Sequence, residues 1–386
     1  MTNAPSFTID PAAFTADPYP DLAAMRARAP IVFVPQLNAL LMTRRNDIST
    51  QEKRIEVFSS DQPGGLMTTL MGENMMRKDG DAHAAERKAT FPAFSPRTVR
   101  DHWLAEFQAA TTAILHTLAP QGACDLVRDF AMPVAGEALR TITGLTNLTA
   151  AEIDQTSQAM IDGVSNFAGD PDVEATCKTA AAKIDAAIDA TQTPNPLSLI
   201  AVQRAANLSD YSTKANVKLA ISGGQNEPRD AIAGTAWALL NNPDQLALIR
   251  TNQATWRDAF EEYARWISPI GMSPRRIAKP DTIHGIDLEP EQRLFFMFSS
   301  GNRDDTVFTD PDTFQITRDT GPSLSFGAGP HFCAGAAASR ALIAEVALPM
   351  LFTRLPNLKI AGDVPFTGWA FRGPTKMPVT WNAVKI

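Results

Sequence analysis

The sequence predicts a mainly α-helical fold with small β-sheets. Helical patterning dominates from residue 82 to residue 266, and strand-like runs lie toward the two ends, at residues 31–34 and 293–298. The 386 residues contain no Gly/Ser linker, low-complexity tract or internal repeat. We therefore expect a single domain over residues 1–386, although length alone would suggest two or three domains.

Composition and charge exclude several classes of function. A hydrophobic content of 44% is that of an ordinary folded protein with a large core, and a net charge of −7 without a basic stripe argues against a nucleic-acid partner. Residues 1–19 lack the basic and apolar regions of a signal peptide, and no uninterrupted run of 18 apolar residues occurs. We expect a cytoplasmic protein without a membrane anchor.

Two features precede the central helices. An apolar stretch at residues 65–71 contains Met67 and Leu70; methionines in a loop adapt to ligand shape, although ordinary packing uses the same residues. A helix opens near Gly80 and carries His83 and Arg87, whose spacing of four places both side chains on one face. The first feature is a candidate pocket wall, and the second offers two basic groups to one ligand.

A proline interrupts the helical pattern in the middle of the chain. The run 221–230 reads Ile-Ser-Gly-Gly-Gln-Asn-Glu-Pro-Arg-Asp, with Glu227 directly before Pro228. Proline has no N–H, and its ring clashes with the carbonyl group four residues earlier, that of Gly224. We expect a kink in mid-helix, with the freed carbonyl and an ordered water at the vacated position.

Residues 255–266 are predicted to form a helix that ends before Ser268 and Pro269. Glu262 and Arg265 lie three residues apart on it and therefore share a face. Taken alone, this is an exposed ion pair of little consequence.

Residues 326–335, Phe-Gly-Ala-Gly-Pro-His-Phe-Cys-Ala-Gly, are the most informative stretch of the chain. Cys333 stands just before residues 336–351, which are predicted to be helical, and the unpaired N–H groups and dipole at a helix start favour a thiolate. The other two cysteines, Cys124 and Cys177, form no C-x-x-C pair with it, so neither a zinc site nor a disulfide framework is indicated.

The remaining residues of this stretch suit a flat ligand. Gly329 and Gly335 let the backbone lie close to a planar group, and Phe326 would shield the sulfur from water. A buried cysteine in a glycine turn is the alternative. The spacing F-x-x-G-x-x-x-C-x-G is complete, and it resembles the haem-binding loop of the cytochrome P450 monooxygenases.

This resemblance implies the triangular cytochrome P450 fold over nearly the whole chain, from residue 17 to residue 381. It implies haem b (Fe-protoporphyrin IX) as cofactor, Cys333 as the metal ligand and O2 as co-substrate. Because no reductase follows Ile386, electrons from NAD(P)H would arrive through a separate iron–sulfur/flavin reductase or ferredoxin. That partner would dock on the cysteine side of the haem, against a basic patch of Lys88, Arg97, Arg100 and Arg340.

The resemblance also assigns roles around the haem. Contacts with the two propionates are implied for His83, Arg87, Arg276 and His331. Glu262 and Arg265 would form a buried structural network with a later arginine. Many relatives have that arginine where Thr313 stands here, which leaves Arg303 and Arg318 as candidates.

The oxygen-activating helix departs from the family pattern. The usual (Ala/Gly)-Gly-x-(Asp/Glu)-Thr is replaced by residues 224–228, so that the acid is kept as Glu227 and the alcohol is lost at Pro228. In the family, the alcohol helps to deliver the protons that oxygen activation requires. Our hypothesis is that Glu227 relays protons with ordered water, at a site shaped by Gly224 and Pro228. The alternative is a kinked helix without a catalytic role.

Asn-Glu-Pro in this helix resembles two bacterial subgroups, one fused to a flavin and iron–sulfur reductase and one that demethylates guaiacol-type ethers. Residues 368–374 resemble the closing hairpin of the same enzymes. We therefore expect oxidative O-demethylation of a small methoxy-aromatic to a phenol or catechol plus formaldehyde. The expected substrate pocket comprises Met67, Leu70, Phe167, Ile270 and Phe371.

Two details refine this expectation, and two alternatives stay open. Gly224, without a side chain, would leave room for a flat ring, and the lack of a cation committed to a carboxylate favours a neutral aromatic. The same machinery would also serve hydroxylation, epoxidation or thiocarbamate oxidation of another small apolar molecule. A haem ligand sensor is the non-enzymatic alternative, but no output module is visible.

Overall fold

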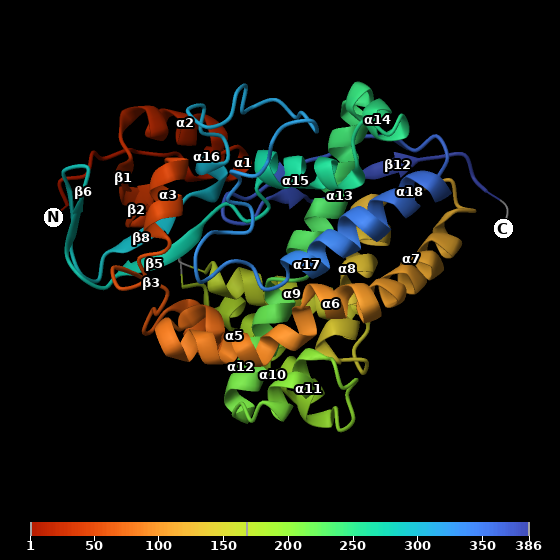
Figure 1. Ribbon diagram of the computed structural model, residues 1–386, viewed down its shortest axis with the longest axis horizontal. Coiled ribbons are helices and arrows are strands. Elements are labelled where there is room, and N and C mark those ends of the chain that lie inside the picture. The colour runs from red at the N-terminus through yellow and green to blue at the C-terminus, as the bar shows by residue number, and fades with distance from the viewer. Residues whose placement is uncertain (1, 167–168, 385–386) are drawn as a thin grey trace. The chain divides into compact units, whose positions relative to one another are not determined.

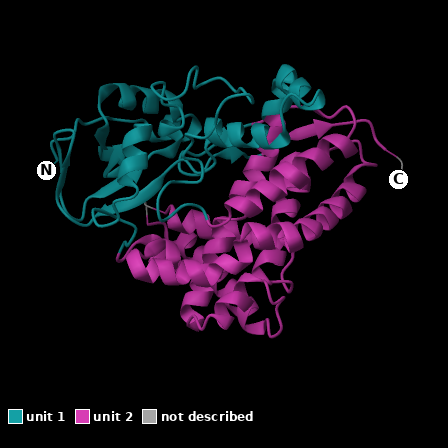
Figure 2. Ribbon diagram, viewed as in Figure 1, with its two compact units in different colours: residues 1–62, 238–333, 365–375 teal, residues 63–237, 334–364, 376–386 magenta. Residues whose placement is uncertain are grey.

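The computed structural model describes residues 2–166 and 169–384 and divides into two compact units (Figure 2). Unit 1 comprises residues 1–62, 238–333 and 365–375. Unit 2 comprises residues 63–237, 334–364 and 376–386. Neither unit is a continuous stretch of sequence, and the expected single domain stays a prediction.

Unit 1 contains the main β-sheet, whose strand order is β1-β2-β8-β5-β3 (Figure 1). Its strands are β1 (Ile31–Val34), β2 (Ala39–Met42), β3 (Phe58–Ser59), β5 (Ser273–Ile277) and β8 (Arg293–Phe296). Both predicted strands are present, but the second ends at Phe296, because Phe298 begins helix α16. Two small hairpins complete the unit: β6 (Asp281–Ile283) with β7 (Ile286–Leu288), and β10 (Phe366–Thr367) with β11 (Gly373–Pro374).

Helices of unit 1 pack on this sheet through two apolar clusters. They are α1 (Pro11–Ala16), α2 (Tyr19–Arg28), α3 (Arg45–Gln51) and α16 (Phe298–Gly301). Unit 1 also contains α14 (Pro243–Arg250) and α15 (Trp256–Ile267). One cluster places Phe58 against Phe296, with ring centroids 5.4 Å apart, and the other buries Leu22 and Met25 of α2. Thr255 and Asp258 form a reciprocal capping box that begins α15 at the predicted position.

Unit 2 is helical, in agreement with the predicted patterning. Its helices are α4 (Leu66–Met71), α5 (Gly80–Phe94), α6 (Pro96–Thr98), α7 (Leu104–Leu118), α8 (Met132–Thr143), α9 (Ala150–Val164), α10 (Pro171–Ala190), α11 (Leu199–Ala205), α12 (Asp210–Ser222), α17 (Ala336–Arg340) and α18 (Leu348–Arg354). Its sheet has the order β4 (Ala123–Asp125), β12 (Pro378–Thr380), β9 (Lys359–Ile360). The boundary between the units falls within α13 (Asn226–Asn241).

The core of unit 2 lies where α9 packs against α8, α10 and α12. Close approach of α9 and α10 needs a glycine at residue 163, because a Cβ there would collide with Cys177. Cys177 is fully buried and serves this packing.

One helical segment of the described chain, Ala336–Arg354, is long and apolar enough to cross a membrane by length and composition. Arg340 and Glu345 interrupt its apolar run, and 56% of the tested window is buried inside the fold. A single helix of this kind is weak evidence for a membrane span, because buried core helices pass the same test. Within this segment, a stretch of π-helix at Ala341–Ala347 joins α17 to α18.

Candidate functional site

The cysteine loop, residues 324–333, is a closed turn within unit 1. The Cys333 N–H donates to the Phe326 carbonyl at 2.9 Å, and the Phe332 N–H donates to the Gly329 carbonyl at 3.2 Å. Gly327 and Gly329 have φ of 72° and 77°, a region that favours glycine. The motif glycines are therefore needed for the path of the loop itself.

Cys333 differs in its surroundings from the other two cysteines. It is half-buried and lies three residues before α17. Cys177 is fully buried, and desolvation together with the nearby carboxylates of Asp129 and Asp125 raises the pKa of Cys124 to about 12. The predicted helix after Cys333 is present and begins at Ala336. That its N–H groups and dipole favour the thiolate stays a prediction.

Two residues of the cysteine motif have structural roles. Phe326 lies between two other rings, with centroids 6.2 Å from Phe260 and 6.3 Å from Phe332. Gly335 is the N-cap of α17 with φ −86°, a conformation open to any residue. The expected shielding of the sulfur by Phe326 and the close approach of a planar ligand to Gly335 stay predictions.

A buried ion-pair network stands at the end of α15. Glu262 and Arg265 are 0% exposed and form two hydrogen bonds, at 2.7 and 2.8 Å. Arg318 donates to the same carboxylate at 3.1 Å. Arg303 donates instead to the Trp266 carbonyl at 2.8 Å, so of the two candidates Arg318 completes the network. Because both charges are desolvated, removal of either partner would leave a costly buried charge.

The expected break in the central helix is present, one turn before Pro228. Helix α12 ends at Ser222 and α13 begins at Asn226, and Pro228 in the first turn of α13 offers no N–H to the Gly224 carbonyl. A Cβ at Gly224 would collide with the Ala220 carbonyl and lie 2.9 Å from Leu139. This glycine therefore has a packing role, and the room it would leave for an aromatic ring stays a prediction.

Glu227 is a buried acid at this break. Desolvation raises its pKa to about 8, with a smaller contribution from the charge of Asp230. Its Oε2 atom has no hydrogen-bond partner among the described residues. A buried oxygen without a partner is rare in folded proteins and calls for a ligand or an ordered water. The side chain therefore holds a proton near neutral pH in a position open to such a group.

Sequence reasoning missed a cluster of charged residues near Glu227 in unit 2, whose charges act on that carboxyl group. Arg229 donates to Asp230 at 2.9 Å and to Asp154 of α9 at 3.1 Å. Gln225 also donates to Asp154, at 2.9 Å. Asp230 is buried, and desolvation raises its pKa to about 6, whereas the Asp154 side chain is 24% exposed. No sequence signal links Asp154 to a helix 75 residues later.

The predicted propionate ligands lie in both units. His83 is buried and Arg87 half-buried on one face of α5, and His331 lies in the cysteine loop. Arg276 of β5 donates to the Asp61 carbonyl at 2.9 Å and to the Glu291 carboxylate at 2.7 Å. Because these oxygens take up much of its donor capacity, its contact with a propionate stays a prediction.

The predicted pocket residues also divide between the units. Ile270 and Phe371 pair in an antiparallel bridge within unit 1, so the structure brings these two together. Met67 and Leu70 belong to α4, which corrects the expected loop, and Leu70 is buried in the core of unit 2. Phe167 lies outside the described residues.

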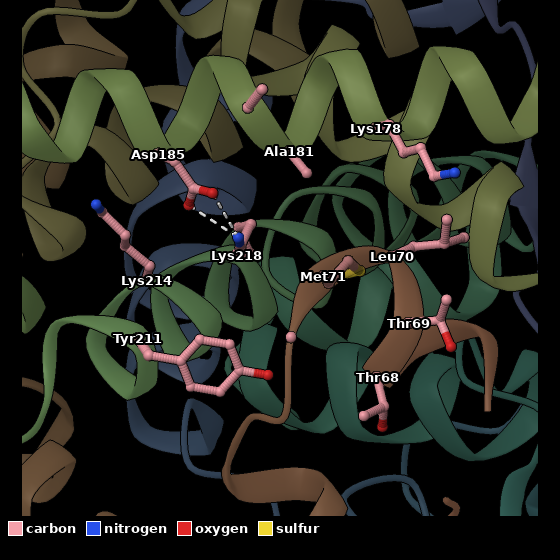
Figure 3. A pocket seen from close by; sticks show the side chains of 12 residues that line it. Thr68, Thr69, Leu70, Met71, Lys178, Ala181, Asp185, Tyr211, Lys214 and Lys218 are labelled. Atoms are coloured by element: carbon pink, nitrogen blue, oxygen red, sulfur yellow. Dashed lines mark hydrogen bonds and ion pairs between the residues drawn. The ribbon is translucent and has the colours of Figure 1, made fainter. Parts of the chain in front are cut away.

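A cavity of about 350 Å³ opens in unit 2 between α4, α10 and α12 (Figure 3). Leu70, Met71 and Tyr211 line it together with three lysines. Each of these lysines is paired with an acid: Lys178 with Glu174, Lys214 with Asp189 at 2.7 Å, and Lys218 with Asp185 at 2.8 Å. Among the described residues, its wall therefore presents no uncompensated cation to a carboxylate ligand.

Comparison with known proteins gives these features a family. The model of the Cytochrome P450 family matches residues 257–354, which include α15, the Glu262 network and the cysteine loop. The chain is 28% identical to the Epothilone C/D epoxidase of Sorangium cellulosum, over 95% of this chain and 94% of that one. It is 29% identical to the Nocardicin C N-oxygenase of Nocardia uniformis subsp. tsuyamanensis, over 96% and 97%.

Solved structures agree with the fold. A crystal structure of P450BioI with an acyl carrier protein superimposes with a TM-score of 0.88 at 23% identity, over 96% of this chain and 100% of that one. CYP109E1 from Bacillus megaterium in complex with testosterone gives 0.87 at 21% identity, over 95% and 98%. These likenesses show that the chain has the cytochrome P450 fold, as predicted.

Residues 257–354 match the Cytochrome P450 family, and nearly the whole chain is similar to bacterial cytochromes P450. It is a haem-dependent monooxygenase with haem b as cofactor, and its electrons come from a separate redox partner. The cysteine loop of unit 1 fits that group, because Cys333 is only half-buried and lies three residues before the start of a helix. Among the described residues, no cluster of three or more His, Cys, Asp or Glu offers another metal site.

Proposed function

We propose that this monooxygenase removes the methyl group of a small, neutral methoxy-arene. One atom of O2 enters a methyl C–H bond, and the other leaves as water with two electrons and two protons. The hemiacetal product then separates into a phenol and formaldehyde. The observation that carries this proposal is the broken helix, in which Glu227 and Pro228 stand where the family has an acid and an alcohol.

In this proposal, Cys333 binds the cofactor and Glu227 transfers protons. The Cys333 thiolate would hold the iron of haem b, and the bound cofactor would supply the activation of O2. Glu227 holds a proton near neutral pH, because burial raises its pKa and so favours its neutral form. Arg229, held between Asp230 and Asp154, places a fixed positive charge near Glu227, and ordered water is the proposed route by which that proton is replaced.

A second candidate is the epoxidation or hydroxylation of a larger apolar molecule. The names of two relatives favour it, the Epothilone C/D epoxidase and the Steroid C26-monooxygenase of Mycolicibacterium smegmatis, 27% identical over 93% of this chain and 91% of that one. Thiocarbamate oxidation would use the same machinery. A haem ligand sensor is not retained, because the curated relatives are oxygenases.

For the redox partner, we propose a ferredoxin or an iron–sulfur/flavin reductase in the cytoplasm. Lys88, Arg97, Arg100 and Arg340, all in unit 2, are the proposed docking residues. The side chains of Arg97 and Arg100 are 87% and 70% exposed, but Asp101 lies 3.6 and 2.7 Å from them. Asp101 weakens this positive patch, so its substitution by Asn should strengthen binding of an acidic partner.

A spectral titration tests the choice of substrate. The holoenzyme is titrated with 2-methoxyphenol, 4-methoxybenzoate and a non-aromatic terpene, while the low-spin to high-spin change is followed. A response to 2-methoxyphenol, with formaldehyde and catechol formed in the presence of reductase and NADH, supports demethylation. A response to the terpene alone favours the second candidate, and a shift with 2-methoxyphenol without formaldehyde contradicts demethylation.

A further inference from the structure

Glu52 is a buried acidic residue at the C-terminal end of a helix, where a negative charge is unfavourable. It is 2% exposed, and it directly follows the last residue of α3, where the helix dipole is negative. Burial raises its pKa to about 7, although the charge of Arg275 and the Ala328 N–H act against that rise. A buried carboxyl group at the wrong end of a helix indicates a role that offsets its cost.

Its contacts point to the cysteine loop of the same unit. Oε2 accepts the Ala328 N–H at 2.6 Å, the short distance of a hydrogen bond to a charged group. Oε1 lies 3.4 Å from Nη2 of Arg275, whose side chain is 2% exposed. The carboxyl group thus satisfies a backbone donor in the middle of the loop, for which the turn itself supplies no carbonyl acceptor.

The loop also packs on the backbone beside Glu52. A Cβ at Gly329 would lie 3.1 Å from the Glu52 carbonyl oxygen and 3.1 Å from Cγ of Lys53. A Cβ at Gly327 would lie 3.2 Å from Oε1 of Glu52. The two glycines that flank Ala328 therefore allow this close approach, and the end of α3 forms a support beneath the loop.

These contacts are coupled to the position of Cys333 by the geometry of the loop. The hydrogen bond from the Cys333 N–H to the Phe326 carbonyl closes the turn at one end, and the Glu52 contact holds Ala328 in its middle. We propose that Glu52 is a positioning residue that holds the cysteine loop in the shape that presents Cys333 to the haem. This inference rests on the family assignment and is independent of the proposed substrate.

The test compares Glu52→Ala and Glu52→Gln with the matched control Glu56→Gln, whose side chain is 54% exposed and 3.6 Å from Arg54. Each holoenzyme is reduced under carbon monoxide, and the decay of the thiolate-type Soret band is timed at mild temperature. Helix content is followed by circular dichroism in the same samples, so that loss of ligation is separated from global unfolding.

We expect Glu52→Ala to lose the thiolate-type band about tenfold faster than the control, as for loss of a hydrogen bond to a charged group, before helix content falls. Glu52→Gln keeps an acceptor oxygen and should fall between the two. If Glu52→Ala does not fold, a faster decay in Glu52→Gln than in Glu56→Gln supports the proposal. Equal decay rates in all folded variants, or decay only together with helix content, overturn it.

Discussion

The cysteine loop and the broken central helix differ in how fully their polar groups are hydrogen-bonded. In the loop, the N–H groups of Gly327, Ala328, Phe332 and Cys333 each have an acceptor, and glycines allow the backbone path. At the break, the side-chain oxygens Oε1 of Gln225 and Oε2 of Glu227 are buried without a partner among the described residues. A metal ligand benefits from a rigid, satisfied support, whereas groups that handle protons need open hydrogen-bonding capacity.

The substitution Cys333→Ser should have the largest effect on activity and tests the role of the cysteine loop. A serine cannot supply a thiolate, so the Soret signature of thiolate ligation should vanish and monooxygenase activity should fall to background. Cys124→Ser is the control, because the raised pKa of Cys124 marks an ordinary neutral thiol. The measurement is the spectrum of the ferrous carbonyl, and an unchanged spectrum in the Cys333 variant would refute the assignment of the ligand.

Glu227→Gln tests the other region with the next largest effect. The amide keeps the shape but cannot carry the proton, so product formed per NADH consumed should fall about 100-fold, the lower range for a lost general acid. The spectrum of the ferrous carbonyl should not change. The hydrogen peroxide released and the product formed are measured together, and full coupling in the variant would contradict the proton relay.

The pH dependence of stability should report the same acid. The folded protein keeps the proton of Glu227, with its raised pKa, up to pH about 8, whereas the unfolded chain releases it near 4.5, so the free energy of unfolding should decline as pH rises through this range. Glu227→Gln should remove this part of the decline, on the order of a few kcal/mol. Urea unfolding at pH 5, 6.5 and 8 checks it, and parallel curves for variant and wild type would oppose it. Glu52 and Asp230 add to the slope in both proteins, with pKa values raised to about 7 and about 6.

A smaller effect is expected for Gly329→Ala in the cysteine loop. Gly285→Ala is a matched control, because both glycines have φ of 77° but only a Cβ at Gly329 would have neighbours within 4 Å. Both variants should lose stability through strain, on the order of 1 kcal/mol or more. Gly329→Ala should lose about 1 kcal/mol more through crowding against Glu52. Equal losses in urea unfolding would mean that the loop does not rest on α3.

Pro228→Ala should have the smallest effect. An alanine N–H can donate to the Gly224 carbonyl and close part of the break, so the protein should gain about 1 kcal/mol. We expect the coupling of NADH consumption to product formation to suffer, because the opening beside Glu227 narrows. Urea unfolding and product yield measured together check this, and a gain in stability without loss of coupling would leave the break without a catalytic role.

Local motifs were readable from the sequence because they depend on neighbours along the chain. The helix after Cys333 and the break before Pro228 follow from helix and proline geometry, and the structure has both. The fold, the haem and the enzyme class followed from the resemblance that the cysteine motif carries. Residues 66–71 were expected to lie in a loop but form a helix. The hydrophobic periodicity of so short an apolar run does not distinguish the two.

The sequence by itself indicated the haem cofactor, and it predicted Cys333 as the metal ligand and Glu227 as the acid of the oxygen-activating helix, since each lies in a short motif. Tertiary structure alone decided that Arg318 rather than Arg303 contacts Glu262, that Arg229 links Asp230 to Asp154, and that Glu52 supports Ala328. Ala328 lies 276 residues from Glu52. Such contacts depend on the path of the whole backbone, and no local propensity or spacing encodes which distant partner a buried charge will meet.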